Sequence, residues 1–328
     1  MEVFKVLTPG AFTTVQDLGR FGYQRMGIPI SGALDRYACQ IGNLLVGNPL
    51  DAAVLEITVM GPRLEIINET HIAMAGAQMG MTLNDEPVSG WQSIRVGPGD
   101  VLDIHQVTSG CRAYLAINGG IDVPVVMGSR ATYVGGHMGG FKGRPLKIND
   151  VLKSGTRTGP DSPRRLPRAW VPLYPENIVL RAISGPQDDF FREGLDTLFS
   201  SDYIVTAKAD RMGYRLQGPG VNSLAHMPPS IISEPSMPGG IQIPADCQPI
   251  VLFVEQTVGG YTKIATVISS DLSRLAQALP GDTVRFESVG LETAHGIYRE
   301  EAARLDRIIR FLSCLLYTSD AADDVSTV

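Results

Sequence analysis

The sequence has little cysteine and histidine, and neither type is clustered. Its 328 residues include four cysteines and five histidines. No CxxC pair occurs, and no HxxxH pair would place two metal ligands on one face of a helix. The pattern therefore predicts neither a disulfide framework nor a zinc site, and we expect no bound metal. Buried free thiols are the simpler interpretation of the cysteines.

Long apolar runs and an excess of positive charge are also lacking. No apolar segment approaches the roughly 18–20 residues that a membrane span needs, and the first residues lack the pattern of a secretion signal. Acidic residues outnumber basic ones by 34 to 28, which gives a formal net charge of −6. Because nucleic acids bind basic surfaces, we do not expect a nucleic acid partner. A cytoplasmic protein with no membrane partner is expected.

Several familiar catalytic motifs are missing. The sequence contains no GxxxxGK[ST] phosphate loop, no GxGxxG turn between a strand and a helix, and no GxSxG nucleophile elbow. It also has no lysine between two methionines that could accept biotin. An ATP-binding or biotin-carrying unit is therefore expected on another chain.

What the sequence does contain is typical of a folded, mainly β protein. Apolar residues make up 44% and charged residues 19%, while 36 glycines and 22 prolines are spread along the chain. Many turns favour many short strands. A few helices are also expected, at residues 34–45 with Ser31 as a cap, at 268–279, and at 291–312, where apolar residues follow helical spacing.

These patterns predict two β-rich domains. We expect an N-terminal domain over residues 1–158, a proline-rich linker over 159–177, a second domain over 178–290 and a C-terminal helix over 291–312. Residues 313–328 do not continue the apolar spacing of that helix. We interpret them as a non-native or disordered tail.

A first group of polar residues lies among glycines in residues 13–36. The candidates for substrate binding are Gln16, Asp17, Arg20 and Arg36, with Asp35 as an acid or base. Asp35 and Arg36 fall in the first turn of an expected helix, where backbone N–H groups favour anions. The alternative interpretation is a helix-capping carboxylate beside a solvated arginine.

A second group contains two arginines four residues apart. Arg211 and Arg215 follow Asp210, and the glycine between them allows close approach of a ligand. Two guanidinium groups in one turn can bind a carboxylate or phosphate. A structural network of ion pairs is an equally valid interpretation.

A third group follows a strong predicted strand, where rigid elements can hold catalytic side chains. It comprises Glu255, Gln256, Gly259, Gly260, Tyr261 and Lys263. An acid, an amide, a phenol and an amine together could polarise a substrate carbonyl. The paired glycines could equally form an ordinary turn.

Taken in order, these segments resemble the biotin-dependent carboxyltransferase family, also called allophanate hydrolase subunit 2 or KipA type. The resemblance runs from about residue 4 to residue 289. It rests on TPGAFTTVQDLGRFGYQRMGIPISGALDR, LLVGNPLDAAVLEITVMGP, DRMGYRLQGP and GGIQIPADCQPIVLFVEQTVGGYTKIATVISSDL. Bacterial stand-alone members of the family include the C-type subunit of 5-oxoprolinase.

The resemblance implies a cyclophilin-like β-barrel and a close relation to the carboxyltransferase half of urea carboxylase. It also implies work with two partners, a KipI-type subunit and a LamB/YcsF-type subunit, which resemble the B-type and A-type subunits of 5-oxoprolinase, respectively. Together these would open 5-oxoproline to glutamate, with ATP bound through the complex. Departures from the common pattern at Val258, Thr262 and Cys247 leave open a branch that acts on a different amide or lactam.

On this interpretation each group of polar residues has a hypothetical role. Arg211 and Arg215 would hold a carboxylate, Lys263 and Tyr261 would polarise a carbonyl, and Asp35 and Glu255 are the acid or base candidates. Two alternatives stay open. One is a carboxyltransferase component of a urea-carboxylase-like system that uses biotin, and the other is a non-catalytic regulatory protein that binds a KipI-type partner.

Overall fold

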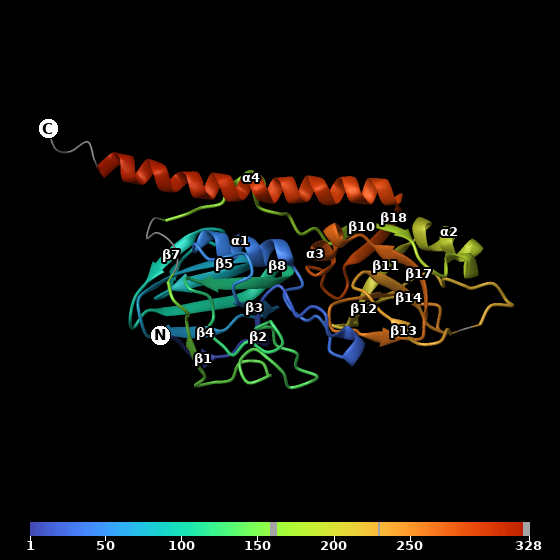
Figure 1. Ribbon diagram of the computed structural model, residues 1–328, viewed down its shortest axis with the longest axis horizontal. Coiled ribbons are helices and arrows are strands. Elements are labelled where there is room, and N and C mark those ends of the chain that lie inside the picture. The colour runs from blue at the N-terminus through green and yellow to red at the C-terminus, as the bar shows by residue number, and fades with distance from the viewer. Residues whose placement is uncertain (158–162, 229, 324–328) are drawn as a thin grey trace. The chain divides into compact units, whose positions relative to one another are not determined.

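The structure is a computed structural model that describes residues 1–157, 163–228 and 230–323. The chain divides into two compact units, each built from separate stretches of sequence (Figure 1). Unit 1 comprises Met1–Gly19, Asp35–Leu173 and Ala302–Val328, and unit 2 comprises Arg20–Leu34 and Tyr174–Glu301. None of the helices in the described residues has the length and apolar character that crossing a lipid bilayer requires.

Unit 1 is built around an antiparallel nine-stranded sheet. Its main path runs in the order β2-β3-β8-β4-β1-β9, and β5 pairs with β6, β7 and β8. The strands are β1 (Glu2–Thr8), β2 (Phe12–Gln16), β3 (Val54–Thr58), β4 (Arg63–Ile66), β5 (Thr70–Leu83), β6 (Glu86–Pro87), β7 (Ser93–Val96), β8 (Val101–Ile117) and β9 (Val151–Lys153). The long strands β5 and β8 form the backbone of this sheet, since each pairs with several shorter ones.

The core of unit 1 is formed by alternating apolar residues of these strands. Val6, Leu55, Leu64 and Leu115 are among its fully buried members. Helix α1 (Arg36–Leu45) packs on β5 and β8. Alanine and glycine on the inner side of the helix allow this close approach, since a Cβ at Gly42 would already touch the side chain of Ala116.

Unit 2 contains a closed barrel with the strand order β10-β17-β14-β15-β12-β11-β18. The strands are β10 (Asn177–Ser184), β11 (Asp202–Ala209), β12 (Gly213–Gln217), β14 (Gly240–Ile243), β15 (Ile250–Leu252), β17 (Thr262–Val267) and β18 (Thr283–Ser288). Only β10 and β18 pair in parallel among the barrel neighbours of the described chain. Closure leaves the barrel without an open edge.

Short elements accompany the barrel. A two-stranded sheet is formed by β13 (Glu234–Pro235) and β16 (Val258–Gly259). Unit 2 also contains the short helices α2 (Arg192–Ser200) and α3 (Leu272–Leu275), with the 3-10 turns η1 (Gln24–Met26), η3 (Asp188–Phe190) and η4 (Ser269–Asp271). The 3-10 turn η2 (Arg168–Trp170) belongs to unit 1.

The expectation of a mainly β fold with a few helices and a β-barrel is confirmed. Helix α1 begins two residues after the start expected for it, and Asp35, rather than Ser31, caps it. The segment expected to be one helix at 268–279 is divided between η4 and α3. The C-terminal helix α4 (Leu291–Asp323) continues beyond residue 312.

The domain boundaries also differ in detail from those expected. The two units change over between Leu173 and Tyr174, inside the expected linker, and residues 20–34 group with unit 2. Part of that linker is packed, because Arg164 and Leu166 are buried. Residues 158–162 of it lie outside the described residues, as do residues 324–328 of the expected tail.

Candidate functional site

A buried lysine and a carboxylate meet on the outer side of the barrel in unit 2. Lys263 in β17 has a side chain that is only 5% exposed, and its ammonium pairs with the carboxylate of Glu234 in β13. Gln187 joins them, because its Oε1 accepts from the Lys263 backbone N–H at 2.9 Å and its Nε2 donates to Glu234 Oε1 at 3.3 Å. The hydrogen bond from Lys263, assisted by Gln187, holds the pKa of Glu234 below its usual value.

Two buried polar groups lie beside this ion pair. Gln242 in β14 stands directly opposite Lys263 in β17, so that both side chains project from the same face of the sheet. Gln242 and Ser236 are each 3% exposed. In the described part of the chain, Gln242 Nε2 and Ser236 Oγ have no hydrogen-bond partner. A buried polar group left unpaired costs about 1–3 kcal/mol, so these two are retained at a cost to stability.

Gly259 in β16 provides the space that brings these groups together. A Cβ at this position would lie 2.6 Å from Gln242 Nε2 and 3.4 Å from Ser236 Oγ. Both groups therefore border the glycine backbone. The neighbouring Gln256 donates from Nε2 to the carbonyl of Val258 at 2.7 Å, which holds the turn before β16. A side chain at position 259 would displace the Gln242 amide, since that amide is buried.

We define the lysine site by the residues that meet here, namely Gln187, Glu234, Ser236, Gln242, Gly259 and Lys263. It offers an ammonium, an amide N–H and a hydroxyl as donors, and one ionised carboxylate as an acceptor. This combination can bind an amide group through both its carbonyl oxygen and its N–H. Negative charge that develops on the carbonyl oxygen would be stabilised by the fixed donors.

A second buried ion pair in unit 2 joins Arg211 and Glu255. Arg211 Nε donates to Glu255 Oε1 at 2.5 Å, and Nη2 donates to the carbonyl of Gly32 at 2.7 Å. The Glu255 backbone N–H donates to the carbonyl of Arg211 at 3.1 Å, and Ser31 N–H donates to the carbonyl of Val254 at 3.0 Å. These bonds attach residues 20–34 to the barrel within the same unit.

The remaining residues of the second polar group have separate partners. Asp210 Oδ1 accepts from the backbone N–H groups of Met212 and Gly213 at 2.7 and 3.3 Å, which is typical of a side-chain turn. Arg215 Nη1 pairs with Asp246 Oδ2 at 2.6 Å on the exposed surface. Arg211 and Arg215 therefore bind different carboxylates rather than forming one clamp.

In unit 1, Gln16 and Asp17 bind a neighbouring loop. Asp17 accepts from Ser129 Oγ at 2.7 Å and from the Arg130 backbone N–H at 2.5 Å. Gln16 Nε2 donates to the carbonyl of Thr132 at 3.1 Å. These contacts hold the loop that follows β8.

Asp35 and Arg36 serve the start of α1. Asp35 accepts from the Ala38 backbone N–H at 3.0 Å, and its own N–H donates to the Tyr114 hydroxyl at 2.7 Å. Burial, together with the nearby Glu56, raises the pKa of Tyr114 well above its ordinary value, so that the hydroxyl stays protonated. Arg36 Nη1 donates to the carbonyl of Leu18 at 3.0 Å.

Of the other residues expected at the site, Arg20 is fully buried in unit 2 and its backbone N–H donates to the carbonyl of Ile30 at 2.7 Å. Tyr261 is 45% exposed and precedes β17, and Gly260 lies between it and Gly259. Of the third polar group, Gly259 and Lys263 belong to the lysine site, whereas Glu255 pairs with Arg211. Across the described residues, no three His, Cys, Asp or Glu side chains form a group that could hold a metal ion.

Sequence reasoning did not select Gln187, Glu234, Ser236 or Gln242. Gln242 had a visible signal, because it is the one polar residue in the apolar strand of GGIQIP. Glu234 and Gln187 had none, since they lie 29 and 76 residues before Lys263 and are brought to it by the barrel.

The structure thus defines a protein with a closed β-barrel that carries a buried lysine, a carboxylate and unpaired amide and hydroxyl groups at one site. The comparisons with known proteins specify the class further. The chain belongs to the family described as carboxyltransferase domain, subdomain A and B, whose model matches residues 26–288.

Three relatives illustrate the similarity. The chain is 38% identical to the C-type subunit of 5-oxoprolinase from Escherichia coli (strain K12), covering 89% of this chain and 93% of that protein. It is 35% identical to a urea amidolyase of Lachancea kluyveri, covering 93% of this chain and 18% of that protein. The crystal structure of the K. lactis urea amidolyase matches with a TM-score of 0.86 at 34% identity, over 93% of this chain and 20% of that one. The chain thus spans less than a fifth of the L. kluyveri protein.

Proposed function

We propose that this chain is a subunit of an ATP-dependent 5-oxoprolinase, which converts 5-oxo-L-proline to L-glutamate together with KipI-type and LamB/YcsF-type subunits. The observation that carries the proposal is the match to the C-type subunit of E. coli 5-oxoprolinase, which extends over nearly the whole length of both chains. A subunit of the same extent is expected to work in an assembly of the same kind.

The chemistry of the lysine site supports this substrate. The lactam ring of 5-oxoproline presents one carbonyl oxygen and one N–H, which complement the donors Gln242 and Lys263 and the acceptor Glu234. In the net reaction water adds to the carbonyl carbon, the C–N bond breaks and the nitrogen takes up a proton. Lys263, Gln242 and Ser236 would stabilise the negative charge on the carbonyl oxygen as the carbonyl is attacked.

The other candidate residues lie outside the lysine site as defined, and their roles in the reaction stay proposals. Tyr261 lies between Gly259 and Lys263 in the sequence and is the second candidate for polarising the carbonyl. Arg211 and Arg215 already have carboxylate partners, Glu255 and Asp246, so a role as a substrate clamp requires those partners to give way. Asp35 and Glu255 remain acid or base candidates.

ATP would be bound by the assembled complex rather than by the lysine site. The site contains one cation and no glycine-rich phosphate loop, so its residues fit the lactam and not a triphosphate. Coupling to ATP favours ring opening of an unstrained lactam, and we derive no step through the nucleotide.

The proposal is tested by producing the chain with KipI-type and LamB/YcsF-type subunits from the same source. ATP-dependent release of glutamate from 5-oxoproline is then measured with each chain omitted in turn. We expect activity only when all three are present. A stable complex without this activity would contradict the proposal, and would favour another amide substrate or a regulatory role.

A second candidate is a carboxyltransferase component of a urea-carboxylase-like system. It is favoured by the similarity to the urea amidolyases of L. kluyveri and K. lactis. The ureido ring of biotin presents a carbonyl and N–H groups, which Gln242, Lys263 and Glu234 could also bind, and carboxybiotin would supply the carboxyl group. Carboxylation of urea, measured with an added biotin carboxylase and carrier protein, distinguishes the two candidates.

A further inference from the structure

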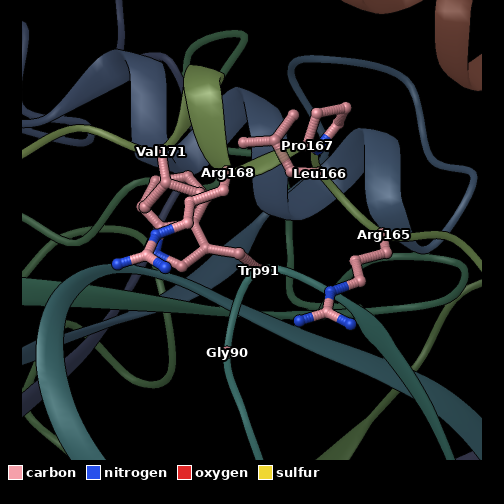
Figure 2. A pocket seen from close by; sticks show the side chains of 7 residues that line it. All are labelled: Gly90, Trp91, Arg165, Leu166, Pro167, Arg168 and Val171. Carbon is pink, nitrogen blue, oxygen red and sulfur yellow. The ribbon is translucent and has the colours of Figure 1, made fainter.

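A cavity of about 330 Å³ lies in unit 1, and none of its lining residues belongs to the lysine site (Figure 2). Its lining consists of Gly90, Trp91, Arg165, Leu166, Pro167, Arg168 and Val171. We call it the arginine–tryptophan pocket. Its volume is at the lower end of the range of small-molecule sites, which is about 300–1,000 Å³.

The segment that carries the two arginines is fixed to the sheet rather than free. Arg164 is buried, its backbone N–H donates to Ser93 Oγ at 2.7 Å, and its Nη1 donates to the carbonyl of Leu44 at 2.7 Å. Leu166 N–H donates to the carbonyl of Trp91 at 2.9 Å. Arg165 lies between these two buried residues and is itself exposed. Hydrogen bonds of Arg164 and Leu166, the two neighbours of Arg165, therefore fix the backbone of the segment that lines the pocket.

The following turn is fixed as well. The carbonyl of Trp170, at the end of η2, accepts from the Tyr37 hydroxyl at 2.7 Å and from Arg304 Nη2 at 3.0 Å. Arg168 begins η2, so the position of its backbone is determined by these bonds. Figure 2 shows both arginine side chains extending from this segment toward the side on which Trp91 lies.

Trp91 has a strained backbone. Its φ of 57° lies in the left-handed region, which is unusual for a bulky residue. Two hydrogen bonds hold this conformation, one from Trp91 N–H to the carbonyl of Met74 at 2.7 Å and one from Leu166 N–H. Such strain costs of order 1–3 kcal/mol and is concentrated at binding sites. Here it presents an aromatic side chain to the cavity.

The charged side chains that line the pocket are both positive. Arg165 and Arg168 form no hydrogen bond or ion pair through their side chains within the described ranges, and no acidic residue lines the cavity. Guanidinium groups bind carboxylates and phosphates through paired N–H donors. Trp91, with Leu166, Pro167 and Val171, offers an apolar surface on which a ring can stack.

We propose that the arginine–tryptophan pocket binds a small ligand that combines a planar ring with a carboxylate or phosphate group. The ring packs on Trp91 and the anionic group is bound by Arg165 and Arg168. This site is independent of the proposed lactam chemistry, because it shares no residue with the lysine site.

The test uses Trp91 as its own reporter. The sequence has two tryptophans, so that Trp170→Phe leaves Trp91 alone, and its fluorescence is titrated with AMP, nicotinate, adenosine and nicotinamide. Calorimetric titration of the unmodified protein repeats the measurement without the substitution. We expect saturable binding of AMP, nicotinate or both, and at least about tenfold weaker binding of the neutral counterparts. The preferred anion identifies a phosphate or a carboxylate ligand.

Substitutions assign the binding to the pocket. Arg165→Gln or Arg168→Gln should each weaken anion binding about tenfold, because a charge-assisted hydrogen bond is lost. Arg63→Gln is the matched control, since Arg63 is also exposed but lies on β4 beside Asp103. Binding that is unchanged by both pocket variants, equal affinity for charged and neutral rings, or no saturation up to about 1 mM would overturn the proposal.

Discussion

Two ion pairs of unit 2, each between a buried basic side chain and a glutamate, look alike by residue type and differ in their surroundings. Arg211 and Glu255 have side chains that are 7% and 9% exposed, and their bonds go to each other and to backbone groups of the same unit. Lys263 is equally buried, but Glu234 is 40% exposed. Gln242 and Ser236, beside the second pair, have buried side-chain atoms without a partner in the described residues, and beside the first pair the hydroxyl of Ser31 is in the same state, so the exposure of Glu234 is what distinguishes the two pairs.

We interpret the Arg211–Glu255 pair as a structural contact and the Lys263–Glu234 pair as part of a binding site, because the two pairs differ in this way. Arg211 holds residues 20–34 against the barrel, because its Nη2 donates to the carbonyl of Gly32 in the same unit. At the lysine site the fold leaves donors available and one acceptor accessible to solvent. Buried polar groups are normally satisfied, and a bound ligand is the explanation we propose for the two unpaired groups beside Lys263.

The largest expected effect is on stability, at the Arg211 pair. Arg211→Ala leaves Glu255 buried without its partner, so we expect the free energy of unfolding in urea to fall by about 3–5 kcal/mol. Arg215→Ala is the control, because the exposed pair with Asp246 contributes about 0–1 kcal/mol. Equal effects of the two variants would show that the Arg211 pair is not a structural contact.

The next effect is on turnover, at Lys263. Lys263→Met keeps an unbranched side chain of nearly the same length and removes its charge, so we expect turnover of the reconstituted complex to fall about a hundredfold. That factor corresponds to about 2.7 kcal/mol of transition-state stabilisation. Stability should fall less than in Arg211→Ala, because Glu234 can be solvated. Lys208→Met, on the exposed side of β11, should leave turnover unchanged.

Gly259→Ala tests the geometry of the lysine site without changing its charge. The added Cβ would overlap the Gln242 amide, so we expect turnover to fall about tenfold through misplacement of that donor. Gly296→Ala is the matched control, since nothing lies within 4 Å of a Cβ there. If both variants retain full turnover, Gln242 is not part of the site.

The smallest effect is the pH dependence that Glu234 contributes. Its pKa is lowered in the folded protein, so its contribution to stability is present above the unfolded pKa and is lost as the pH falls through the folded pKa. Thermal unfolding should therefore show Glu234→Gln less stable than the parent protein at pH 7. The gap should close on acidification below the ordinary pKa of a glutamate. A gap that persists at low pH would contradict the assignment.

Some features of the fold and of the lysine site could be predicted from the sequence, because patterns within short segments specify them. The turn chemistry and strand patterns indicated the mainly β fold, and Gly259 and Lys263 lie in one short segment whose composition already indicated polar chemistry. The helix expected over residues 34–45 followed from its apolar spacing, although Asp35 caps it in place of the expected Ser31.

Other features depend on contacts between distant residues. Asp17 and Gln16 were predicted to bind substrate, but in the structure they also bind Ser129 and Thr132, which lie more than 110 residues away in the sequence. The grouping of residues 20–34 with unit 2 rests on bonds to Arg211 and Val254. The register that sets Gln242 opposite Lys263 includes an irregularity in β14, and no local pattern specifies it.

The most direct test of the central claim is ATP-dependent glutamate release from 5-oxoproline by the three-chain complex carrying Lys263→Met, compared with the unmodified complex at equal assembly. The account predicts an intact complex whose turnover is lower by about a hundredfold. An intact complex with unchanged turnover would contradict it, because the lysine site would then have no part in the reaction.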